Sequence, residues 1–146
     1  MMSLAVFPQD WESSYAETIA TAKVENKPIL LVFSGSDWCG PCMKLDRDIW
    51  NSPEFKTYAK EKLVLYKADF PRKKGQQLPL DQALENKALA EKYNPNGYFP
   101  LVVLLDKQQQ VLGETGYQKI SPQDYVSLLN SYIKWRYIYP SFLFSF

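Results

Sequence analysis

Two cysteines, Cys39 and Cys42, are separated by two residues and are the only cysteines in this chain of 146 residues. They follow the apolar run 29–33 and precede a segment with helical periodicity. A strand that leads through a tight turn into a helix places the first thiol at the helix N-terminus, where free backbone N–H groups and the helix dipole favour the thiolate. Because the thiolate attacks disulfides, this spacing predicts thiol-disulfide exchange.

A metal site is the main alternative for a C-x-x-C pair. Structural zinc needs four Cys or His ligands, and the chain has no histidine, so zinc would require two chains to share one site. Two thiolates also suit Cu(I), with Met43 as a further soft ligand, although a methionine on a helix is more often a core filler. We expect no metal and no cofactor.

The composition predicts one globular domain over residues 1–146, with a core at about 11–135, because 46% of the residues are hydrophobic. The formal net charge is +1, from 17 basic and 16 acidic residues, which argues against nucleic acid or an anionic membrane as a partner. No apolar stretch reaches the roughly 20 residues of a membrane span. We expect a monomer.

Apolar periodicity and turn residues define the elements that must position the two thiols. Trp11, Tyr15, Ile19 and Ala22 recur at helical spacing and predict a first helix that ends at about residue 25. The further expected elements are a strand at 29–33, helices at 42–50 and from Ser52 onward, a strand at 63–70, a loop at 71–80, a helix at 81–93, strands at 101–105 and 110–116, and a final helix that opens at Ser121-Pro122.

Residues 38–42 read Trp-Cys-Gly-Pro-Cys and resemble the active site of the thioredoxin superfamily, which lies at the same strand-to-helix junction. The order of the expected elements also resembles that family over about 11–135. The resemblance implies an α/β thioredoxin fold, in which helices flank both faces of a central mixed sheet. It further implies that Cys39 is the exposed nucleophile and Cys42 the buried resolving thiol.

Five further residues are candidates for substrate binding. Gly40 and Pro41 suit the turn at the helix start, since proline pre-sets its φ and has no N–H to leave unpaired. Trp38 is expected either to shield the thiols and contact the partner or simply to pack in the core. Phe99 and Pro100 precede a strand where the family carries a cis-proline that faces the active site, although an ordinary strand-start proline is the alternative.

The chain departs from the thioredoxin pattern at the buried base. Thioredoxins carry a buried Asp six residues before the nucleophile, and that position is Phe33 here. Their partner lysine on the next strand is expected to be replaced by Leu65. Asp37 is the nearest carboxylate in sequence, and we expect it to be solvated or to cap a turn. Loss of the base would change how Cys42 is deprotonated without abolishing exchange.

Three segments, 26–30, 34–39 and 68–74, resemble bacterial single-domain Dsb-type thiol-disulfide oxidoreductases and disulfide isomerases that work outside the cytoplasm. This resemblance implies a reductase or isomerase of protein disulfides in the periplasm, with the cytoplasm as the alternative. It also implies thiol- or disulfide-containing substrate proteins and an upstream redox partner of the membrane-reductase or thioredoxin-reductase type. An oxidase role stays open, because reduction potential and partners fix the direction. A further alternative that stays open is a redox-inert interaction domain with the same fold.

Three parts of the chain have no firm assignment. The basic run 72–74 could bind an acidic partner, although a short basic run in a loop is usually solvated. The first ten residues lack the charged and apolar regions of a secretory signal, as would also be true of a mature form. The tail 138–146, rich in Tyr and Phe, is too short to cross a membrane and has no assigned role.

Overall fold

The computed structural model describes residues 11–138 and contains a four-stranded mixed sheet in the order β2-β1-β3-β4. The strands are β1 at Ile29–Ser34, β2 at Val64–Asp69, β3 at Leu101–Leu105 and β4 at Val111–Thr115. β1 is parallel to β2 and antiparallel to β3, and β4 is antiparallel to β3. This is the predicted thioredoxin fold, with each strand close to its expected position.

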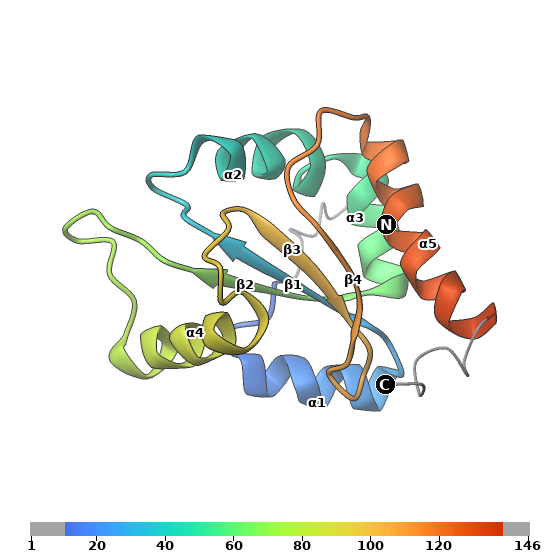
Figure 1. The fold of residues 1–146 in the computed structure, drawn as a ribbon, viewed down its shortest axis with the longest axis horizontal. Coiled ribbons are helices and arrows are strands. Elements are labelled where there is room, and N and C mark those ends of the chain that lie inside the picture. Colours follow the sequence, from blue (N-terminus) through green and yellow to red (C-terminus); the bar gives the residue numbers. More distant parts are fainter. Residues whose placement is uncertain (1–10, 139–146) are drawn as a thin grey trace, which may run out of the picture.

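Helices cover both faces of this sheet (Figure 1). They are α1 at Tyr15–Glu25, α2 at Gly40–Leu45, a π-helical turn η1 at Asp46–Trp50, α3 at Pro53–Lys62, α4 at Leu80–Tyr93 and α5 at Pro122–Ile138. In Figure 1, α2, α3 and α5 lie on one side of the sheet, and α1 and α4 lie on the other. The carboxyl end of β1 points toward the start of α2, which brings the C-x-x-C pair to that end of the sheet.

The central strand separates two hydrophobic cores. All six residues of β1 are buried, as expected for a central strand covered on both faces. Val32 packs with Trp50 in the core under α2, α3 and α5. Phe33 points to the opposite face and packs with Tyr66 in the core under α1 and α4. The strand position that faces the active-site helix is therefore Val32, whereas Phe33, six residues before Cys39, faces the other core.

Two predicted helix starts differ from the structure. The first helix begins at Tyr15, because the side chain of Ser14 caps it by accepting the N–H of Glu17 at 3.1 Å. Trp11 lies outside that helix and instead forms an isolated parallel bridge with Leu65 of β2. The active-site helix begins at Gly40, two residues earlier than predicted.

Over residues 11–138, none of the helices has both the length and the apolar character that a membrane span requires. The tail at 139–146 lies outside the described residues, as do residues 1–10.

Candidate active site

Cys39 and Cys42 form a disulfide at the start of α2, with their Cα atoms 5.3 Å apart. Cys39 is the N-cap of the helix, and its Sγ accepts the backbone N–H of Cys42 at 3.3 Å. Gly35 donates its N–H to the Sγ of Cys42 at 3.5 Å. A thiolate on either sulfur would thus have a backbone donor within reach, and that of Cys39 would also gain from the helix N-terminus.

The two sulfur-bearing residues differ little in exposure. Cys39 is 5% exposed and Cys42 is 2% exposed. The expectation of an exposed Cys39 is wrong for this oxidised form, because its sulfur is bonded to Cys42 against the first turn of α2. Pro41 occupies that turn, where its missing N–H costs no hydrogen bond.

Trp38 is fixed beside the disulfide by three neighbours. Its Nε1 donates to the carbonyl oxygen of Phe70 at 2.7 Å, and its ring meets that of Phe99 edge-on at 5.3 Å. Gly35 lies directly against the indole, because a Cβ added there would be 2.2 Å from Cε2 of Trp38. Trp38 therefore joins the two segments that flank the C-x-x-C pair, rather than packing in either core.

A groove of about 430 Å³ runs beside the disulfide. Its lining residues are Pro41, Tyr98, Phe99, Pro100, Leu101, Thr115, Gly116 and Tyr117. The Phe99–Pro100 peptide bond is cis, as predicted. The groove is mostly apolar and aromatic, and it brings together three of the predicted substrate-binding residues: Pro41, Phe99 and Pro100.

Asp37 ties the active-site loop to the segment that follows β2. Its carboxylate accepts the backbone N–H groups of Arg72 at 3.0 Å and of Lys73 at 2.9 Å. These hydrogen bonds hold the pKa of Asp37 below its usual value, and the charge of Lys73 lowers it further. The prediction that Asp37 caps a turn fits these contacts. Asp69 makes a second tie, accepting from the backbone N–H of Ser36 at 2.9 Å.

Arg72 is not simply solvated, contrary to the expectation for the basic run. Its guanidinium carbon lies 3.6 Å from the ring centroid of Trp38. A second cation, Lys44 of α2, lies over the ring of Tyr117, which lines the groove. Met43, next to Lys44, is 43% exposed and therefore does not fill the core.

An ion pair that the sequence interpretation missed lies one helical turn after Cys42. Asp46 accepts a hydrogen bond from Nζ of Lys67 at 2.7 Å, and the same Nζ lies 4.5 Å from the ring centroid of Trp11. Lys67 is paired in register with Val32, two residues after Leu65, so this strand carries a lysine at a position other than the one expected from the family. Residues four apart on a helix are neighbours, which places Asp46 on the same side as Cys42.

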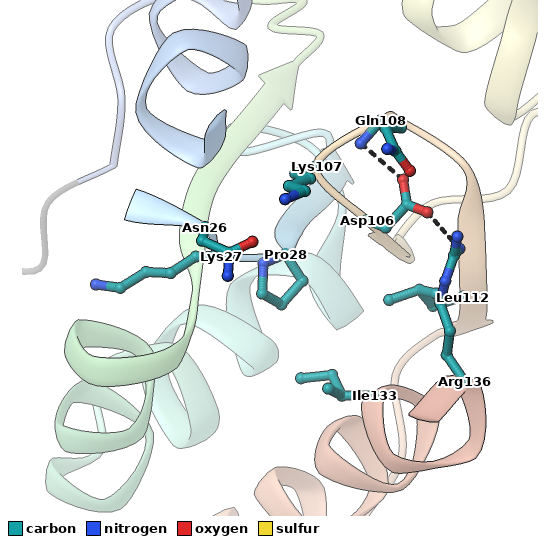
Figure 2. Close-up of a pocket in the computed structure, with 9 residues that line it drawn as sticks. All are labelled: Asn26, Lys27, Pro28, Asp106, Lys107, Gln108, Leu112, Ile133 and Arg136. Atoms are coloured by element: carbon teal, nitrogen blue, oxygen red, sulfur yellow. Dashed lines mark hydrogen bonds and ion pairs between the residues drawn. The ribbon is translucent and has the colours of Figure 1, made fainter. Parts of the chain in front are cut away.

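A second cavity, of about 360 Å³, lies where the turn between β3 and β4 approaches the end of α5. Figure 2 shows Asp106 between the backbone of Gln108 and the side chain of Arg136, with which it forms an ion pair. None of the predicted site residues lines this cavity.

Comparison with known families gives one profile match, to a family described as thioredoxin-like, over residues 10–107. The disulfide bond reductase DsbH of Chlamydia pneumoniae is 39% identical over 126 residues, which cover 86% of this chain and 74% of that protein. The thioredoxin-related protein DsbJ of the same organism is 32% identical over 106 residues, covering 73% of this chain but 30% of DsbJ.

Solved structures agree with these matches. A structure described as DsbH oxidoreductase superposes with a TM-score of 0.82 at 35% identity, covering 92% of this chain and 90% of that one. A thioredoxin from Thermus thermophilus gives a TM-score of 0.63 at 15% identity, over 85% of this chain and 87% of that one. The second likeness concerns the fold alone.

Proposed function

Because this chain belongs to the thioredoxin-like family and is a thiol-disulfide oxidoreductase, we propose that it reduces disulfides of substrate proteins, with Cys39 as the attacking thiol. The observation that carries the proposal is the position of Cys39, whose Sγ accepts a helix N-terminal N–H beside an open groove. The name of the relative DsbH, a disulfide bond reductase, supports this direction over oxidation.

The reaction starts from the dithiol form. The Cys39 thiolate attacks one sulfur of the substrate disulfide, which forms a mixed disulfide and releases the other substrate sulfur as a thiolate. The Cys42 thiolate then attacks Sγ of Cys39 and releases the second substrate sulfur. Two electrons pass to the substrate, both substrate thiolates take up protons, and the product is the Cys39–Cys42 disulfide seen in the structure.

The groove beside the disulfide accepts the substrate chain. Phe99 lines the groove and meets the ring of Trp38 edge-on, and the peptide ahead of Pro100 offers backbone groups to an extended segment. Gly40 leaves open space at the helix start, since no atom lies within 4 Å of the position a Cβ would take. Isomerisation uses the same first step, with a second substrate thiol resolving the mixed disulfide instead of Cys42.

Cys42 must lose its proton before it attacks, and its exposed fraction of 2% limits access of water. The Asp46–Lys67 pair is the ionised pair nearest to it along the helix, so Asp46 acts as a positioning residue that influences this deprotonation. Asp46→Asn is expected to shift the pH dependence of mixed-disulfide resolution, measured by stopped flow. An unchanged pH profile would contradict this role, and Asp48→Asn, which removes a neighbouring exposed carboxylate, is the matched control.

The partners and the compartment are proposed with support from the same relatives. A reductase needs an upstream dithiol donor to return two electrons after each cycle, and a membrane reductase or a thioredoxin reductase could supply them. The periplasm is the proposed compartment, supported by the similarity to DsbH and DsbJ. A single domain that acts as a monomer is sufficient for this chemistry.

Insulin reduction in the presence of dithiothreitol tests the proposed function. Wild type is expected to accelerate precipitation of the insulin B chain, and Cys39→Ser is expected to fall to the uncatalysed rate. Cys42→Ser is expected to accumulate a mixed disulfide through Cys39, identified by mass spectrometry. Activity retained by Cys39→Ser would overturn the assignment of the nucleophile.

A further inference from the structure

The segment that follows β2 carries three consecutive exposed cations, Arg72, Lys73 and Lys74. Figure 1 shows this loop projecting beyond the sheet on the same side as the loop between β1 and α2. Its backbone is held there by Asp37, which accepts the N–H groups of Arg72 and Lys73. The backbone that carries Arg72 and Lys73 is therefore fixed against the active-site loop by hydrogen bonds between two segments.

Arg72 and Lys44 each lie over an aromatic ring that borders the site. Arg72 covers Trp38 at 3.6 Å, and Lys44 lies 5.8 Å from the centroid of Tyr117. An arginine over an aromatic ring keeps its N–H donors in the guanidinium plane, where carboxylate oxygens bind. One cation thus lies over the ring that precedes Cys39, and the other lies over a ring that lines the groove.

The nearby carboxylates already have partners within the described part of the chain. Asp37 bonds to the backbone of Arg72 and Lys73, and Asp69 bonds to Ser36. The ion pairs found among residues 11–138 engage other cations: Lys27, Arg47, Lys67 and Arg136. Residues 72–74 are exposed, and within the described residues none of them forms an ion pair at contact distance, although the charge of Lys73 acts on Asp37 and that of Lys44 on Asp48.

We propose that Lys44, Arg72, Lys73 and Lys74 form a cationic rim that binds Asp- and Glu-rich segments flanking the disulfide of a substrate protein. The inference rests on the proposed function, because it names the class of substrate that the redox site receives. Opposite charges attract before the sulfurs meet, so the rim raises the association rate of acidic substrates and makes it sensitive to salt.

The binding test uses two disulfide-free peptides of equal length, one with Glu and one with Lys around a central Ser-Gly-Ser, and the oxidised protein. Calorimetry at low salt is expected to give affinity at least about tenfold higher for the acidic peptide. The variant Lys73→Glu/Lys74→Glu is expected to abolish this preference. It leaves Arg72 and Trp38 in place.

A matched control is Lys23→Glu/Lys107→Glu, which makes the same charge change in the last turn of α1 and in the turn after β3. The proposal expects this control to keep the preference for the acidic peptide. Equal binding of both peptides by wild type, or equal losses in the two double variants, would overturn it. So would binding of anionic phosphatidylserine vesicles without any preference between the peptides.

Turnover separates this inference from the proposed function. Reduction of uncharged hydroxyethyl disulfide by wild type reports on the redox site itself. If hydroxyethyl disulfide is reduced but the acidic peptide binds no more tightly than the basic one, the proposed cationic rim is wrong and the proposed reductase function is retained. If the acidic peptide binds preferentially but no disulfide is reduced, the rim stands and the proposed function fails.

Discussion

At each end of the sheet an aspartate accepts backbone N–H groups, but the two aspartates stabilise different kinds of structure. At the redox end, Asp37 accepts the backbone N–H groups of Arg72 and Lys73, which lie 35 and 36 positions later in the sequence. At the other end, Asp106 accepts them from its own turn, at Gln108 and Gln110. The first arrangement joins two separate loops around the sulfurs, whereas the second stabilises one local hairpin.

The cavities at the two ends have similar volumes, about 430 Å³ beside the disulfide and about 360 Å³ beside Arg136. Size therefore does not identify the functional end. What distinguishes it is a reactive pair, Cys39 and Cys42, with backbone donors on both sulfurs and a groove lined by aromatic rings. The comparison predicts that substitutions at the redox end alter turnover, and that those at the other end alter only stability.

Gly35→Ala should give the largest effect, because it acts on the loop that carries both Trp38 and the N–H donor to Cys42. A Cβ at 2.2 Å from the indole forces Trp38 to move, at an expected cost of about 1–3 kcal/mol in the free energy of unfolding. Insulin reduction should slow as well. Urea unfolding and turnover measure the two effects.

The matched control for the stability measurement is Gly40→Ala, since a Cβ there would meet no atom within 4 Å. Equal destabilisation by the two substitutions would contradict the claim that Gly35 supports Trp38.

Arg136→Gln tests the opposite end of the sheet, where a substitution should alter stability but not turnover. It removes the cation paired with Asp106 and leaves a buried carboxylate oxygen without it, at an expected cost of about 1 kcal/mol. Insulin reduction should remain within about twofold of wild type. Lys107→Gln, an exposed cation in the same turn, should change stability by less than about 0.5 kcal/mol. A large loss of turnover in Arg136→Gln would mean that the two ends are coupled.

Asp37→Asn should give the smallest effect, and its pH dependence has a definite sign. The backbone hydrogen bonds from Arg72 and Lys73 lower the pKa of Asp37 in the folded state. The carboxylate therefore contributes stability above its unfolded pKa of about 3.9, and this contribution is lost as pH falls through the lower folded pKa. Wild type and variant should differ in urea midpoint at pH 7 and converge near pH 2.

Glu91→Gln, which removes an exposed carboxylate from α4, is the control for this series. A difference between wild type and Asp37→Asn that stays constant down to pH 2 would contradict the assigned role of Asp37.

The sequence predicts what depends on local pattern. The strand at β1 and the cis bond before Pro100 follow from short-range signals and from the family resemblance. The side of the sheet on which Phe33 lies cannot be predicted from such short-range signals. All of β1 is buried, so it has no alternation of polar and apolar residues to mark its two faces, and a shift of one residue exchanges them.

The contacts that join distant segments were also beyond the sequence. Asp46 and Lys67 are 21 residues apart, and their pairing depends on how η1 lies on β2. Arg72 over Trp38 depends on the tie made by Asp37. Lys67 in the interior of β2 was the available signal for the first contact, because a charged residue in a largely buried strand usually has a partner.

The equilibrium reduction potential of the Cys39–Cys42 pair tests the central claim most directly. The protein is equilibrated with mixtures of reduced and oxidised dithiothreitol or glutathione, the free thiols are trapped, and the oxidised fraction is read by mass spectrometry. The account predicts a value near that of thioredoxin, about −270 mV, as a reductase requires. A value near that of DsbA, about −120 mV, would contradict it and assign the protein to disulfide formation.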